Sequence, residues 1–83
     1  MSVNRVLLTG RLTADPDLKV AGESKTVICS MRLAIQRRRM NGTDRGAIYV
    51  DVTAFERQAQ NCAKYLRKGS RVAIDGRLEH SEW

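Results

Sequence analysis

Two aromatic side chains on the polar face of a predicted strand are the first residues of this 83-residue chain that could bind a ligand. Apolar and polar residues alternate over 48–55, which predicts a half-buried strand with Tyr49 and Phe55 on its polar side. Large rings on such a face are costly to leave in water unless something covers them. An unpaired nucleobase is one cover, because its stacking contributes about 1–3 kcal/mol whatever the base. A loop or a subunit interface is the alternative cover.

Guanidinium groups are concentrated just before this strand. Eleven of the fifteen basic residues are arginine, and the formal net charge is +6 at pH 7, which favours a polyanionic partner. Four arginines lie in the polar connection 37–46, namely Arg37, Arg38, Arg39 and Arg45. A basic connection beside exposed rings offers a phosphate track and a stacking platform, the two features that single-stranded nucleic acid needs. The alternative is a solvated turn whose charges only keep the chain soluble.

The residue types needed for catalysis or metal binding do not come together. His80 is the only histidine, so it builds neither a zinc site nor a Ser-His-Asp triad. Cys29 and Cys62 lack metal-ligand spacing and fall on apolar stripes, which predicts free core thiols in a reducing compartment. No glycine-rich run of the kind that cradles a nucleotide occurs. We therefore expect no enzyme activity, no metal and no cofactor.

Hydrophobic periodicity predicts the elements that must position these side chains. Period-two alternation predicts four strands, over 6–12, 27–36, 48–55 and 71–79. Before the last strand, Ala59, Cys62, Ala63 and Leu66 form one apolar helical stripe. The order β-β-β-α-β favours an all-β fold with a small, strongly curved antiparallel sheet or barrel. The length fits a single domain, 1–83, and no apolar run is long enough to span a membrane.

Four segments then match a known pattern, N-R-V-L-L-T-G-R-L at 4–12, D-P at 15–16, A-K-Y-L-R-K-G-S-R-V at 63–72 and D-G-R-L at 75–78. In this order and spacing, over 3–83, they resemble the bacterial single-stranded DNA-binding protein family. The resemblance implies an OB-fold, a five-stranded Greek-key β-barrel whose helix lies between its third and fourth strands.

The resemblance also carries functional expectations. It implies sequence-nonspecific binding of single-stranded DNA in replication, recombination and repair, by a cytoplasmic, nucleoid-associated protein that is usually a homotetramer. It leaves one alternative from another class, an OB-fold interaction subunit of a replication-restart (primosome) complex. In that case the rings of the sheet would be buried against protein, and single strands would not compete for them.

Individual site residues follow from the same resemblance. Tyr49, Phe55 and Trp83 fall where the family places base-stacking aromatics, and a further stacking position matches Arg39. The candidate phosphate contacts are the basic residues of the connection and of outward strand positions: Arg37, Arg38, Arg39 and Arg45, with Arg5, Arg11, Arg32, Arg71 and Arg77.

The chain departs from the family pattern beyond Trp83. Family members continue into a further hairpin, a fifth strand, a linker and a short acidic tip that recruits other proteins. We therefore expect a C-terminally incomplete OB-fold that lacks its fifth strand, with an unpaired sheet edge. A neighbouring subunit could cover that edge. Recruitment of partners through an acidic C-terminal tip is not expected of this chain.

Overall fold

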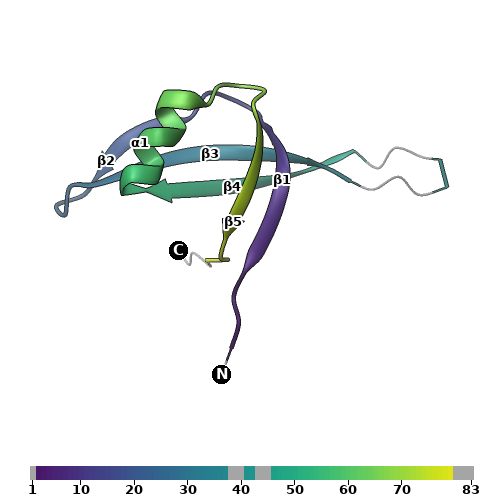
Figure 1. Cartoon of the computed structure of the whole chain (residues 1–83), viewed down its shortest axis with the longest axis horizontal. Coiled ribbons are helices and arrows are strands. Elements are labelled where there is room, and N and C mark those ends of the chain that lie inside the picture. The colour runs from purple at the N-terminus through teal and green to yellow at the C-terminus, as the bar shows by residue number, and fades with distance from the viewer. Residues whose placement is uncertain (1, 38–40, 43–45, 80–83) are drawn as a thin grey trace.

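The computed structural model describes residues 2–37, 41–42 and 46–79. Its elements, in chain order, are β1 (Val6–Leu12), β2 (Asp17–Ala21), β3 (Thr26–Gln36), β4 (Ala47–Phe55), α1 (Glu56–Tyr65) and β5 (Arg71–Gly76). The five strands form one open antiparallel sheet, and α1 lies over one side of it (Figure 1). The expected all-β class and OB-fold are confirmed by this arrangement.

The central strand is β3, whose two edges carry most of the sheet. One edge pairs with β4 along almost its whole length, and the other pairs first with β2 and then with β1. The contact with β1 is short, with Arg11 opposite Ala34 and Leu12 opposite Leu33. Beyond it β1 turns away and pairs with β5, so the β1–β5 pair crosses the long β3–β4 hairpin (Figure 1).

The number of predicted strands is wrong by one. The segment Asp17–Ala21, which directly follows the D-P pair at 15–16, forms β2 and brings the described part of the chain to five strands. The segment is short and has only two large apolar residues, Leu18 and Val20, and both remain exposed when paired with β3. The sheet is nevertheless open, because among the described residues β4 and β5 each pair on one edge only.

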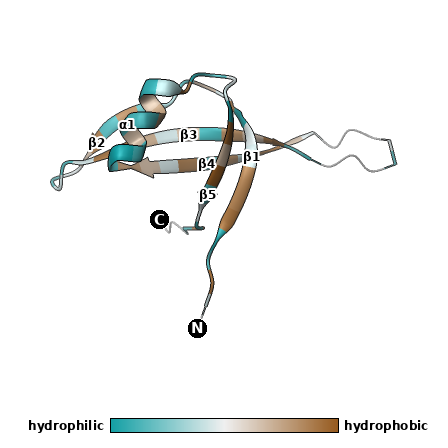
Figure 2. Ribbon diagram, viewed as in Figure 1, coloured by the Kyte–Doolittle hydropathy of each residue, from teal (hydrophilic) through white to brown (hydrophobic). Residues whose placement is uncertain are grey.

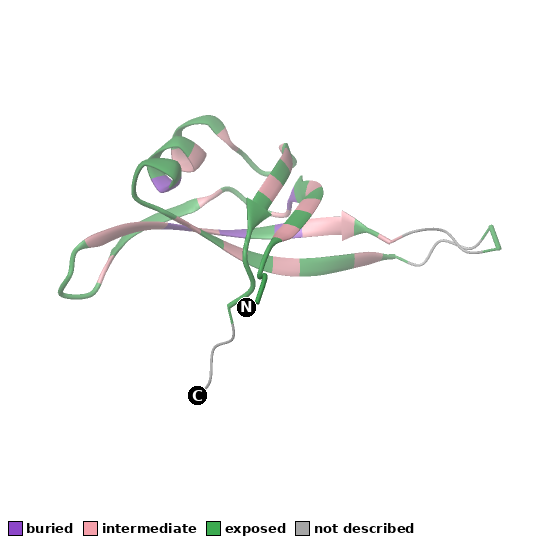
Figure 3. Cartoon of the chain, turned by 60° about the horizontal axis from the view of Figure 1, so that its bottom comes forward, coloured by how far each residue is buried: buried purple, intermediate pink, exposed green. Residues whose placement is uncertain are grey.

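A small core lies between the sheet and the helix. Cys29, Met31 and Leu33 alternate along β3 and are buried, and Leu12 of β1 and Ala59 of α1 join them. Figure 3 shows these buried positions on β3 and α1. In Figure 2, brown apolar segments lie along β1 and β5, while much of α1 is teal. The alternation predicted for 27–36 is therefore confirmed, as is the apolar helical stripe.

The turn between α1 and β5 is fixed by side-chain capping. Arg67 Nη1 donates to the carbonyls of Ala63, Lys64 and Leu66, at 3.3, 3.5 and 2.7 Å, and so satisfies the end of the helix. Asp15 Oδ1 accepts a 2.8 Å hydrogen bond from the Lys68 backbone N–H. These contacts tie the turn to the β1–β2 connection and set where β5 begins.

Candidate nucleic-acid interface

The outer face of the β3–β4 hairpin, opposite the core, carries the two predicted stacking rings. Tyr49 is 56% exposed and Phe55 is 54% exposed, which is unusual for large rings in a paired strand. The residues between them are polar rather than apolar. The opposed pairs of this face are Tyr49–Ala34, Asp51–Arg32, Thr53–Ser30 and Phe55–Ile28.

The ring of Tyr49 has a cation on one side. The guanidinium carbon of Arg32 lies 5.2 Å from the ring centroid, within the range of a cation–π contact. The contact is diagonal, because Tyr49 opposes the small residue Ala34 and Arg32 lies further along β3. Ala34 leaves room beside the ring, so Tyr49 is held in place without being covered.

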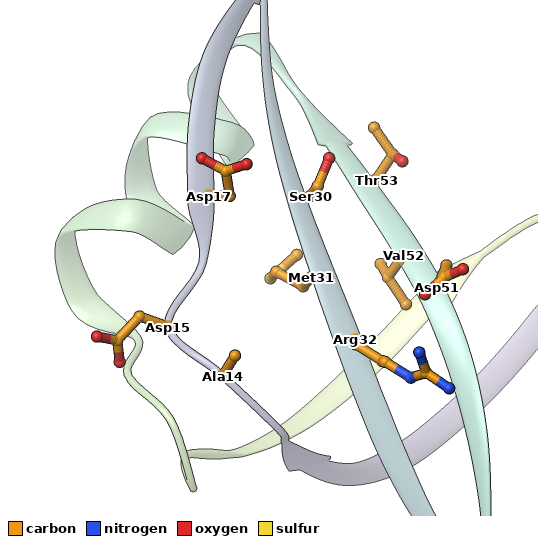
Figure 4. A pocket seen from close by; sticks show the side chains of 9 residues that line it. All are labelled: Ala14, Asp15, Asp17, Ser30, Met31, Arg32, Asp51, Val52 and Thr53. Carbon is orange, nitrogen blue, oxygen red and sulfur yellow. The ribbon is translucent and has the colours of Figure 1, made fainter.

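A shallow depression of about 430 Å³ lies beside β2, β3 and β4, next to the part of β4 that separates the two rings in sequence. Hydroxyl, carboxylate and guanidinium groups of three neighbouring strands surround it, as Figure 4 shows. Its lining residues are Ala14, Asp15, Asp17, Ser30, Met31, Arg32, Asp51, Val52 and Thr53. Two of the carboxylates already have partners, Asp15 at the Lys68 N–H and Asp17 at the Lys19 ammonium, 3.3 Å away. Over the described residues no group of three or more metal-ligating side chains occurs.

The arginines on and directly next to β1 and β5 differ in what they contact. Arg5 forms a two-pronged ion pair with Asp75, at 3.1 and 2.8 Å, and this hydrogen bonding raises the pKa of Arg5. Arg77 pairs with Glu79 at 2.9 Å. These two guanidiniums are therefore partly neutralised by carboxylates of their own chain.

Arg11 and Arg71 are placed differently. They stand directly opposite each other on β1 and β5, both exposed, and neither pairs with a carboxylate in the described part of the chain. Arg11 also opposes Ala34, which opposes Tyr49. The sheet thus brings Tyr49, Arg11 and Arg71 into one row across four strands, which spacing along the sequence does not reveal.

Of the remaining site residues that the sequence predicted, one lies within the described ranges. Arg37 follows β3 and is half-buried, and its backbone N–H donates to the Gly46 carbonyl at 2.9 Å. Arg38, Arg39, Arg45 and Trp83 lie outside the described residues.

Sequence reasoning overlooked one exposed ring. Tyr65, at the end of α1, is 68% exposed and has the Lys64 ammonium 5.2 Å from its ring centroid. The helical period places Tyr65 off the apolar stripe, and this position could have predicted from the sequence that its ring is exposed. Because it lies on the helix, Tyr65 is separate from the outer face of β3–β4.

Comparison with known proteins gives a consistent result. Residues 3–83 match the family model described as the single-strand binding protein family. The chain is 41% identical over 78 residues to "Single-stranded DNA-binding protein 1" of Staphylococcus aureus strain MSSA476, covering 93% of this chain and 49% of the relative. It is 39% identical over 83 residues to the "Single-stranded DNA-binding protein" of Treponema pallidum strain Nichols, covering 98% and 47%.

A third relative, the "Single-stranded DNA-binding protein" of Bacillus cereus, is 40% identical over 78 residues, covering 93% of this chain and 45% of its own length. The chain therefore spans about half the length of the relatives it matches. In the described residues, no helix has the length and apolar character of a membrane span. The family match extends over nearly the whole sequence and agrees with the fold, so this chain belongs to the single-strand binding protein family.

Proposed function

We propose that this chain binds single-stranded DNA without sequence preference and has no enzymatic activity. Bases stack on Tyr49 and Phe55, with Trp83 as a third ring, while guanidinium groups neutralise the backbone. The observation that carries this proposal is the pair of half-exposed rings on one polar face of β4. Stacking on a ring tolerates every base, because every base has a π-face, so this mechanism needs no sequence readout.

Two further findings support the proposal. The relatives named above are called single-stranded DNA-binding proteins, and they share about 40% of the aligned residues with this chain. The formal charge of +6 favours a polyanion over a neutral ligand. The primosome alternative is not favoured, since the family model and the named relatives are described as single-strand binding proteins.

The cellular role and the oligomeric state are part of the same proposal. The protein acts in the cytoplasm, on the single strands exposed during replication, recombination and repair. It works as a homo-oligomer, a tetramer in line with the family resemblance. The free edges of β4 and β5 in the described sheet support self-association, because an unpaired strand edge readily pairs with another chain.

Titration of the protein with oligothymidine at low salt tests the proposal. We expect saturable binding by anisotropy of a labelled strand, together with quenching of the single tryptophan, Trp83. Affinity should fall as salt rises, with a log–log slope of about 0.7 for each phosphate neutralised. Binding that leaves tryptophan fluorescence unchanged contradicts stacking on Trp83, and absence of binding at low salt overturns the function itself.

A matched RNA oligomer at the same salt concentration defines the ligand class. Stacking and phosphate contacts are shared by both sugars, and only a contact to the 2′-hydroxyl distinguishes them. We expect DNA and RNA affinities within about tenfold of each other if these two contacts dominate. A much tighter RNA complex would make RNA the ligand and overturn the assignment to DNA.

A further inference from the structure

Two like charges are held face to face on the outer surface of the sheet. Arg11 of β1 and Arg71 of β5 are directly opposite in the antiparallel register, so both side chains leave the same face. Like charges in such a pair destabilise a sheet. By contrast Arg5, just before β1, is neutralised by Asp75 of β5. Within the described ranges, Arg11 and Arg71 have no such carboxylate.

The backbone around this pair is firmly held. Leu12 and the turn that precedes β5 exchange two hydrogen bonds, from the Gly69 N–H to the Leu12 carbonyl at 2.8 Å and from the Leu12 N–H to the Ser70 carbonyl at 3.0 Å. Arg11 Nη1 also donates to the Gly69 carbonyl at 3.2 Å. Since a guanidinium has five N–H donors, Arg11 keeps several for a ligand. The backbone beneath the pair and the Arg11 side chain are therefore held in place, with Arg71 directly opposite in the register.

A groove of about 410 Å³ opens beside the pair. Its lining residues are Thr9, Gly10, Arg11, Ala34, Ile35, Gln36, Ala47 and Arg71. Two of the lining residues, Gly10 and Ala34, are small and lie where β1 and β3 meet, so short side chains form the bottom of the groove. Ala34, which lines the groove, is paired with Tyr49 on β4, so the first stacking ring lies one strand beyond the groove.

We propose that Arg11 and Arg71 together form a phosphate-binding site in this groove. A phosphate oxyanion between the two guanidiniums replaces their repulsion with two charge-assisted sets of hydrogen bonds. When single-stranded DNA is bound, the group in this site is a backbone phosphodiester near the base that stacks on Tyr49. This assignment of the site to DNA rests on the proposed function. The carboxylate of Asp75, on β5, is occupied by Arg5.

The site can be tested without DNA, using pyrophosphate as the probe at constant ionic strength. The variants are Arg71→Gln and, as the control, Arg57→Gln, which removes an exposed guanidinium of α1 that does not line the groove. We expect pyrophosphate to raise the thermal midpoint of the wild type and of Arg57→Gln but not of Arg71→Gln. Without pyrophosphate, Arg71→Gln should melt at or above the wild-type temperature, because a repulsion is removed. Equal stabilisation of all three proteins by pyrophosphate overturns the site.

Binding of oligothymidine tests the strand-bound form of the proposal. Arg71→Gln should lower affinity about tenfold at low salt and reduce the salt slope by about 0.7, the value for one phosphate contact. Arg57→Gln should change the slope less, because Arg57 lies on α1 and does not line the groove. An unchanged slope in Arg71→Gln shows that strand phosphates do not use the site and overturns this form. A wild type that binds no strand contradicts the proposed function, and the pyrophosphate experiment alone then decides the site.

Discussion

Tyr49 presents two ring faces of different character. The Arg32 guanidinium lies against the ring, and this cation–π contact orients a side chain that is otherwise half in water. A ring held in one orientation loses less conformational freedom when a base stacks on it. Arg32 was expected to contact phosphate, whereas its position in the unbound protein is over the ring. Its role in DNA binding stays a prediction.

Removal of single rings should separate stacking from charge neutralisation. We expect Phe55→Ala and Tyr49→Ala each to weaken binding of oligothymidine by about 1–3 kcal/mol, the value of one stacked base. The salt slope should stay unchanged, because no phosphate contact is lost. Both quantities come from anisotropy titrations over a series of salt concentrations.

Tyr65→Ala is the matched control for these variants. Tyr65 is as exposed as the other two rings but lies on α1, away from the outer face of β4. We expect its removal to leave affinity unchanged within error. If Tyr65→Ala weakens binding as much as Phe55→Ala does, the strand runs over the helix and the β4 face is not the interface.

The two thiols give a pH-dependent prediction. Burial raises the pKa of both Cys29 and Cys62 above the ordinary value of 9.0. Below that value the thiols are neutral in the folded and in the unfolded chain. The free energy that they contribute to folding is then fully present and does not change with pH. As pH rises above it, the unfolded chain loses its thiol protons first, and stability falls. Urea midpoints at increasing alkaline pH should therefore decline.

The double variant Cys29→Ala/Cys62→Ala provides the comparison. It should be less stable at neutral pH, because Cys29 is fully buried, but its midpoint should fall less steeply between neutral and alkaline pH. This difference in slope isolates the thiols from the lysines and tyrosines, which both proteins share. Parallel pH profiles of the two proteins would contradict the assignment.

For single side chains, the sequence could predict on which face of a strand each one lies. Alternation placed Tyr49 and Phe55 opposite the core, and the structure agrees. The partner of each arginine could not be predicted in this way. Whether Arg77 meets Glu79 or Arg71 faces Arg11 depends on register and rotamer, which a period of two does not encode.

Strand β2 was the one secondary-structure element of the described sheet that hydrophobic periodicity did not predict. Period-two alternation is informative only where one face is buried, and four of the five residues of β2 are exposed. It forms because β3 offers a free edge there, with Asp17 opposite Ser30 and Ala21 opposite Thr26. The long strands β3 and β4, which bury one face, were predicted to within one residue.

The crossing of β1 over β3 depends on a glycine. A Cβ atom at Gly10 would lie 2.3 Å from the Ala34 carbonyl oxygen, a backbone atom that cannot move aside cheaply. We expect Gly10→Ala to destabilise the fold by about 3 kcal/mol, as overpacking does when backbone must shift. For a domain of this size the thermal midpoint should drop by more than about 10 °C. Circular dichroism melting measures the shift.

Gly76→Ala is the control within the same sheet. Its nearest side-chain atom would be 3.9 Å away, an ordinary contact, and its φ is not positive. We expect a change within about 0.5 kcal/mol of zero, because alanine fits and slightly restricts the unfolded chain. If the two variants melt alike, close approach of β1 and β3 does not hold the sheet together at this point.

The whole molecule combines a small core with an incomplete set of strand pairings. Five residues are buried in the described part of the chain, and several large apolar side chains are exposed, among them Val3, Leu7 and Leu78 at the free ends of β1 and β5. A domain with so little buried surface is marginal by itself. Exposed apolar side chains next to an unpaired edge are typical of surfaces that another chain covers.

Association should therefore contribute to the stability of the fold. If the chain is a homo-oligomer, dissociation accompanies unfolding, and the thermal midpoint rises with protein concentration by mass action. We expect an upward shift over about a hundredfold range of concentration, with a mass above that of the monomer by sedimentation. Leu7→Glu places a charge on the outer face of β1 and should lower both the mass and the midpoint. A monomeric mass with a concentration-independent midpoint would show that the open sheet is stable alone.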